Sequence, residues 1–105
     1  METPLVSILI CTYNSASTIE DTLLSCLHQT YHHIEILIHD DQSIDNTIDI
    51  INNIWHNKIK IITSWQKLRP YWGLNFLLEH TQGEYIAIQD HDDLWHSEKI
   101  QKQIN

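Results

Sequence analysis

The chain has few basic residues, and this shortage limits the partners it can have. Six Lys and Arg stand against 14 Asp and Glu in 105 residues, which gives a formal net charge of -8. Such a surface lacks the basic stripes that displace counterions from nucleic acids or anionic membranes, so we expect no nucleic-acid partner. It is compatible with a bound cation. The composition is that of one soluble globular domain, without low-complexity segments or linkers.

Long apolar runs and cysteine motifs are also absent. No stretch approaches the roughly 18 apolar residues of a membrane span, and the start METPLVSILICTYN lacks the basic region and cleavage site of a signal peptide. Cys11 and Cys26 lie in apolar surroundings without CxxC spacing, which predicts buried thiols in a reducing compartment. We therefore expect a cytoplasmic protein.

The chain does contain a regular alternation of strand and helix patterns. Apolar, β-branched runs predict strands at 5–11, 34–41, 58–63 and 84–89, the first and last of them buried. Helical spacing predicts helices from a capping box at 17–20 to about 29, from 43–45 to Trp55, from about 73 to 80, and from 98 onward. The segment around Pro70 is predicted to be an ordered loop. This alternation indicates an α/β, Rossmann-like architecture, a parallel sheet flanked by helices.

Polar residues follow three of the four predicted strands. The first strand ends in Cys11-Thr12-Tyr13-Asn14, the second in Asp40-Asp41 and the fourth in Asp90-His91-Asp92-Asp93. Ligands of open parallel sheets bind beyond the carboxyl ends of the strands, so we expect five carboxylates around one cleft. Carboxylates so close together raise one another's pKa values unless a cation offsets them. Mg²⁺ or Mn²⁺ suits such oxygen ligands and takes others from substrate phosphates.

Alternatives remain open for individual residues at this stage. Asp45 and Asp93, taken singly, are also typical of helix caps and turns. The loop CTYNSAST is not a GxGxxG fingerprint and no GK[ST] occurs, so dinucleotide-binding and P-loop hypotheses are poor. Tyr13 is expected to form a stacking surface for a ring, the alternative being that it covers the sheet edge. Trp95 is expected to pack under the site and fix its loop.

Four segments in order resemble the signature segments of family 2 glycosyltransferases: VSILICTYN, SCLHQTY, IHDDQSIDNT and GEYIAIQDHDDLWHSEK. The resemblance implies a GT-A fold, with residues 1–105 as a single domain forming its N-terminal, nucleotide-sugar-binding part, apparently truncated. It also implies transfer of a sugar from a UDP- or dTDP-type donor to a saccharide or lipid-linked acceptor, in polysaccharide biosynthesis. The full-length protein would then act in the cytoplasm or peripherally at the inner membrane.

The resemblance also implies roles for particular residues. Cys11, Thr12, Tyr13 and Asn14 would line the nucleotide pocket, with Tyr13 against the base. Asp41 would accept a hydrogen bond from the base. Asp90 and Asp92 would form a DxD pair, Asp90 toward the ribose and Asp92 on a Mn²⁺ or Mg²⁺ ion that bridges the diphosphate. Asp93 and Asn75 would lie near the donor sugar or behind these groups.

The chain also departs from the family pattern. The Arg that many members carry on the helix before GEYI is absent, because Gly73-Leu74-Asn75 stands there, and Gln42 replaces the usual Gly of DDGS. No catalytic base can be assigned, and we expect it beyond Asn105, so that this chain alone would be inactive or nearly so.

Two other functions remain as alternatives. The first is a non-catalytic nucleotide-binding remnant, for which self-association through an exposed sheet edge is expected. The second is a receiver-like phosphoacceptor module.

Overall fold

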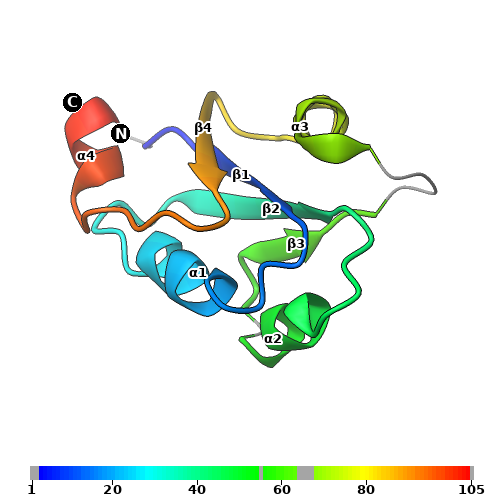
Figure 1. Ribbon diagram of the computed structural model, residues 1–105. Coiled ribbons are helices and arrows are strands. Elements are labelled where there is room, and N and C mark those ends of the chain that lie inside the picture. Colours follow the sequence, from blue (N-terminus) through cyan, green and yellow to red (C-terminus); the bar gives the residue numbers. More distant parts are fainter. Residues whose placement is uncertain (1–2, 55, 64–67, 105) are drawn as a thin grey trace.

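The computed structural model describes residues 3–54, 56–63 and 68–104, which form one parallel four-stranded sheet with helices on both sides (Figure 1). The strand order is β3-β2-β1-β4, so β1 is central and β4 lies at an edge. The elements, in chain order, are β1 (Val6–Thr12), α1 (Ile19–Leu27), β2 (Ile34–Asp40), α2 (Thr47–Asn53), β3 (Ile59–Ile61), α3 (Arg69–Leu78), β4 (Tyr85–Asp90) and α4 (Lys99–Ile104).

The two faces of the sheet are built from alternate residues of the buried strands. In β1, Val6, Ile8 and Ile10 belong to the larger core, together with apolar residues of α1 such as Leu23. Leu9 and its neighbour Leu37 in β2 point to the opposite face, where they pack with Leu77 of α3. Figure 1 shows α1 and α2 on one side of the sheet and α3 on the other. Both faces of β1 and β2 are covered, which agrees with sequences that are apolar on both faces apart from a few buried polar residues such as Glu35.

Close approach of α3 to the sheet depends on Gly73. A Cβ atom at this position would lie 2.9 Å from Cys11 Sγ and 3.2 Å from His39 Nδ1. His39 is fully buried beneath α3, and its ring meets the edge of Phe76 with the ring centroids 5.5 Å apart. Burial lowers the pKa of His39, although the charges of Asp41 and Asp40 oppose the shift.

The predicted α/β architecture is confirmed, but several predicted elements differ. The segment around Pro70 is not a loop throughout: α3 begins at Arg69, with Pro70 in its first turn, where the missing N–H costs nothing. Residues 64–67 lie outside the described part of the chain, as does Trp55. The strand predicted at 58–63 is reduced to Ile59–Ile61.

The predicted capping box is also wrong. The N-cap of α1 is Thr18, and its side chain makes no capping hydrogen bond. Its hydroxyl instead donates to the carbonyl of His91, 3.0 Å away and 73 positions later in the chain. The pattern Ser17-Thr18-Ile19-Glu20 predicts Ser17 as the N-cap, so the helix begins one residue later than expected.

The fourth strand is not buried as predicted. Tyr85, Ile86 and Ile88 are 54%, 41% and 57% exposed. The described residues pair β4 with β1 and with no strand on its outer side. An apolar run predicts a strand but does not show whether that strand lies at the edge or in the middle of the sheet. The burial of β4 was therefore predicted wrongly because its edge position was unknown.

Both cysteines are reduced thiols, as predicted. Cys26 is buried in the larger core and Cys11 is half-buried. Burial raises the pKa of Cys11 to about 11, with a further contribution from the negative charge of Asp41. Burial raises the pKa of Cys26 to about 12, against a hydrogen bond with Ser25 that lowers it. Of the helices described, none combines the length and the apolarity that a membrane crossing requires.

Candidate functional site

The polar ends of three strands meet at one edge of the sheet. In the parallel register, Thr12 at the end of β1 is the partner of Asp40 at the end of β2. On the other side of β1, Cys11 is the partner of Asp90 at the end of β4. This is the edge at which α/β sheets bind ligands.

Asp40 is committed to holding the loops together. Its Oδ1 accepts hydrogen bonds from the hydroxyls of Thr12 and Ser43, each at 2.6 Å, and its Oδ2 accepts the Ser43 N–H at 2.9 Å. Thr12 is buried and supplies its hydroxyl to this network. Asp40 therefore organises the site from within the protein, unlike the open carboxylate expected from sequence.

Asn14 joins the loops that follow β1 and β2. Its N–H donates to Ser43 Oγ at 2.8 Å, and its side-chain Oδ1 accepts the N–H of Ile44 at 2.9 Å. Asn14 and Gln42 have φ angles of 48° and 61°, in the left-handed region that favours Gly and tolerates Asn. Gln42 thus occupies a conformation that favours glycine, the residue that the resemblance leads one to expect there. The predicted contacts of Thr12 and Asn14 with a nucleotide stay predictions.

Asp41 lies deeper than its neighbours and is 5% exposed. Its Oδ1 accepts the N–H of Leu68 at 2.6 Å, and its own N–H donates to the carbonyl of Thr12 at 2.8 Å. The first bond anchors the residue before α3 to the end of β2.

Cys11, Asp90 and Asp92 line one cavity of about 200 Å³. Its other walls come from α3 and β4, through Leu74, Ile88, Gln89 and His91. No described residue hydrogen-bonds the carboxylate of Asp90 or Asp92. These two acids are thus the ones that the protein leaves available at this edge.

The residues around this cavity fit a hard cation that shares its ligands with a phosphate. Within residues 3–54, 56–63 and 68–104, no three His, Cys, Asp or Glu side chains gather closely enough to form a metal site by themselves. Two carboxylates in one cavity nevertheless suit Mg²⁺ or Mn²⁺, which keep waters and take further ligands from a bound diphosphate.

The remaining predicted residues lie around this centre. Tyr13 is 44% exposed just beyond β1, so one part of its ring is accessible for stacking. Asn75 is half-buried on α3. Asp93 is exposed, accepts the N–H of Leu94 at 2.9 Å, and lines a separate cavity with Trp95 and Lys99. The structure therefore separates Asp93 from the Asp90 and Asp92 cavity.

Asp45 takes the turn role that was left open for it, just ahead of α2, whose N-cap is Asn46. Its Oδ1 accepts the N–H of Thr47 at 3.0 Å at the start of α2, and its Oδ2 accepts the N–H of Ala16 at 3.2 Å. A hydrogen bond from the Thr47 side chain is the main cause of a lowered Asp45 pKa. Trp95 packs against the larger core, and its predicted role of fixing the loop of the site stays a prediction.

Sequence reasoning missed the role of the segment Gln29-Thr30-Tyr31. Gln29 is buried and bonds to the backbone of the segment after β4, while the Tyr31 hydroxyl donates to the carbonyl of Pro4. These contacts are structural and lie away from the strand ends. The only sequence signal for these contacts is that Gln29 and Tyr31 are polar residues close to apolar ones.

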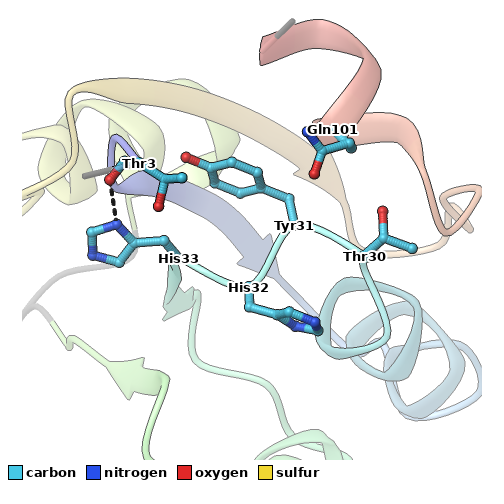
Figure 2. A pocket seen from close by; sticks show the side chains of 6 residues that line it. All are labelled: Thr3, Thr30, Tyr31, His32, His33 and Gln101. Atoms are coloured by element: carbon cyan, nitrogen blue, oxygen red, sulfur yellow. Dashed lines mark hydrogen bonds between the residues drawn. The ribbon is translucent and has the colours of Figure 1, made fainter. Parts of the chain in front are cut away.

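Another cavity, of about 450 Å³, lies toward the opposite ends of the strands, before the start of β2. Figure 2 shows the Tyr31 ring extending between Thr3 and Gln101, and the His33 ring reaching Thr3. The His33 Nδ1 lies 2.7 Å from the Thr3 carbonyl, and since a carbonyl only accepts, Nδ1 carries the proton. Among the described residues, no carboxylate lines this cavity.

Comparison with protein families gives a match to one of them. The sequence profile described as "Glycosyl transferase family 2" matches residues 7–105. A relative from Escherichia coli, UDP-Glc:alpha-D-GlcNAc-diphosphoundecaprenol beta-1,3-glucosyltransferase WfaP, is 45% identical over 101 residues, covering 96% of this chain and 40% of WfaP. The chain thus spans less than half the length of this relative.

Solved structures give the same result for the backbone. TarS of S. aureus, crystallised with UDP, has a TM-score of 0.85 and 25% identity over 93% of this chain and 30% of its own. The mannosyltransferase PcManGT of Pyrobaculum calidifontis, in complex with GDP-Man and Mn²⁺, has a TM-score of 0.81 and 28% identity over 90% of this chain and 29% of its own. The predicted Rossmann-like GT-A fold is confirmed.

Proposed function

This chain belongs to glycosyltransferase family 2, and we propose that it supplies the donor-binding part of an enzyme using a UDP- or dTDP-type sugar. The acceptor is a saccharide or a lipid-linked saccharide, and Mn²⁺ or Mg²⁺ assists the transfer. The observation that carries the proposal is the pair of available carboxylates, Asp90 and Asp92, in one cavity with Cys11 at the carboxyl edge of the sheet. The whole enzyme's activity is part of the proposal, because the chain spans only part of its relatives.

The relatives support the choice of substrates. WfaP is named for a UDP-glucose donor and a diphosphoundecaprenol-linked acceptor. TarS was crystallised with UDP, and PcManGT with GDP-Man and Mn²⁺. A lipid-linked acceptor would bring the enzyme to the cytoplasmic face of the inner membrane. The receiver-like alternative required an acid pair after the first strand, and family membership leaves it without support.

The proposed roles follow the geometry of the strand ends. Asp92, with Asp90, would hold the divalent ion, which supplies positive charge for the departing nucleoside diphosphate. The exposed Tyr13 ring would stack on the base, and Asp41 would accept a hydrogen bond from the base beside its bond with Leu68. Asp40 would leave the nucleotide untouched and keep the two loops in place. The catalytic base is not assigned to any residue of this chain.

Titration with UDP and dTDP, in Mn²⁺ and in EDTA, tests the proposal. We expect the wild-type chain to bind at least one of them more tightly with Mn²⁺. Asp92→Asn should weaken the Mn²⁺-dependent binding by more than about tenfold, the usual minimum for disturbing a metal's surroundings. Asp49→Asn, a change of equal charge at an exposed position on α2, is the matched control and should bind normally. Absence of metal-dependent nucleotide binding by folded protein would sink the proposal.

A further inference from the structure

Helix α1 presents a row of polar side chains on one face. Thr18, Thr22, Ser25 and Gln29 follow one another at intervals of four, three and four residues, counted from the residue numbers. This spacing places them on one face of a helix and its ends. Thr22 and Gln29 are 0% and 1% exposed, so the row is not a solvated face. We call these four residues the α1 seam.

The α1 seam bonds the segment that follows β4, in the same order along both. The hydroxyls of Thr18 and Thr22 each donate to the His91 carbonyl, both at 3.0 Å. Ser25 Oγ accepts the N–H of Trp95 at 3.3 Å. Gln29 Nε2 donates to the His96 carbonyl at 2.8 Å, while its Oε1 accepts the N–H of Ile100 at 3.1 Å. The chain from 91 to 100 is thus fixed along α1 by side-chain to backbone bonds.

The first of these bonds reach the centre of the candidate site. His91 lies between Asp90 and Asp92, and its carbonyl receives two hydroxyl donors, as many as its two lone pairs accept. Gln89 adds a third restraint from below, because its Nε2 donates to the Asp93 carbonyl at 2.7 Å. All three bonds end on backbone carbonyls. They therefore fix the peptide group before Asp92 and the one after Asp93, while leaving the carboxylates of Asp90 and Asp92 available.

We propose that Thr18 and Thr22 are positioning residues that hold the loop of Asp90 and Asp92 in the geometry that receives the metal-bound diphosphate. The inference rests on the proposed function. Two like charges in one cavity repel each other, so a loose loop would carry them apart before a cation arrives. If the backbone is already fixed, the loop need not rearrange when the metal-bound diphosphate binds. Residues that hydrogen-bond to metal ligands generally act in this way, by holding the ligands in place.

The test replaces both threonines by the isosteric Thr18→Val and Thr22→Val and measures two properties. Mn²⁺-dependent UDP affinity should fall by roughly tenfold, the usual effect of losing a partner behind a metal ligand. UDP binding in EDTA should not change. Amide hydrogen exchange at residues 91–94 should accelerate, because the loop has lost its anchors. Thr22→Ser alone, which keeps the hydroxyl, should retain the wild-type Mn²⁺-dependent UDP affinity and the wild-type exchange rates at residues 91–94.

Two control variants separate positioning from general stability. Gln29→Leu acts at the far end of the α1 seam and should lower the melting temperature without reducing Mn²⁺-dependent UDP affinity. Thr81→Val removes the hydrogen bond from the Thr81 hydroxyl to the Leu78 carbonyl, which lies outside the 91–94 loop. This change should leave UDP affinity and amide exchange of the loop unchanged.

Unchanged loop exchange and UDP affinity in the valine pair would overturn the inference, and so would an equal loss of affinity in Gln29→Leu. If the wild type shows no Mn²⁺-dependent binding, the proposed function fails. The exchange measurement then still decides whether the two threonines hold the loop.

Discussion

At the scale of single residues, Glu35 shows how the protein keeps a charge inside. This carboxylate is buried on β2, on the face covered by α3. Its Oε2 accepts the Ser7 hydroxyl at 2.5 Å and the Gln82 N–H at 2.8 Å, and Lys60 Nζ lies 3.2 Å from Oε1. Burial alone would raise the pKa of Glu35, but these hydrogen bonds and the Lys60 charge outweigh it and leave the pKa below its ordinary value.

The lowered pKa of Glu35 predicts a loss of stability in acid. A carboxyl group whose pKa is lower when folded contributes stability above its ordinary pKa of 4.5, and that contribution disappears as the pH falls through the folded pKa. Glu35→Gln should cost about 1–3 kcal/mol of unfolding free energy at pH 7, since it weakens a buried network. Below pH 4.5 the difference from the wild type should shrink.

Urea unfolding between pH 7 and pH 3 measures this effect. Glu84→Gln, at an exposed position, is the control and should follow the wild type throughout. If the curves for Glu35→Gln and wild type stay parallel over the whole pH range, the charge of Glu35 does not support the fold.

At the scale of elements, regular patterns were predictable and their exceptions were not. The strands β1 and β2 were identified because predominantly apolar, β-branched runs are typical of strands covered on both faces. The start of α3 was missed because Pro70 reads as a helix breaker, although the first turn accepts it. The N-cap of α1 was predicted one residue early, at Ser17, and the Thr18 side chain that stands there makes no cap but bonds to His91, a partner that no local pattern contains.

The packing of α3 on the sheet gives a prediction at this scale. Gly73→Ala would favour the helix itself by about 1 kcal/mol. The new Cβ, however, would lie 2.9 Å from Cys11 Sγ, too close without movement of the side chain or the helix. Overpacking typically costs about 1–3 kcal/mol, so we expect a net loss of stability.

A double-mutant cycle identifies the cause of that loss. Cys11→Ala removes the sulfur, so the pair Cys11→Ala with Gly73→Ala should be more stable than the sum of the single changes predicts, by about 1 kcal/mol. Thermal unfolding of the four proteins gives the coupling. Strict additivity would show that the sulfur is not what Gly73 accommodates.

At the scale of the whole molecule, the convergence of the polar strand ends was predictable, and the different contacts of the acids at those ends were not. Parallel strands bring their carboxyl ends to one edge, so the convergence of the polar ends follows from fold class. Which acid remains available depends on contacts between distant parts of the chain. Asp40 is engaged by Thr12, 28 positions away, and Asp41 by Leu68, 27 positions away. Such pairings follow from the assembled sheet and have no signature in either segment.

The exposed edge of β4 gives a last prediction, self-association of this chain. Among the described residues β4 pairs with β1, and its outer side presents backbone donors and acceptors beside Tyr85, Ile86 and Ile88, which are 41–57% exposed. Edges of this kind pair with other strands unless a charge prevents it. We expect sedimentation velocity to show oligomers that increase with concentration, and Ile88→Lys to shift the chain toward monomer. Ile44→Lys makes the same change at a position that is 89% exposed but away from the sheet edge, so it should leave the association unchanged. If the wild type stays monomeric, or if Ile88→Lys and Ile44→Lys reduce the oligomers equally, β4 is not the contact.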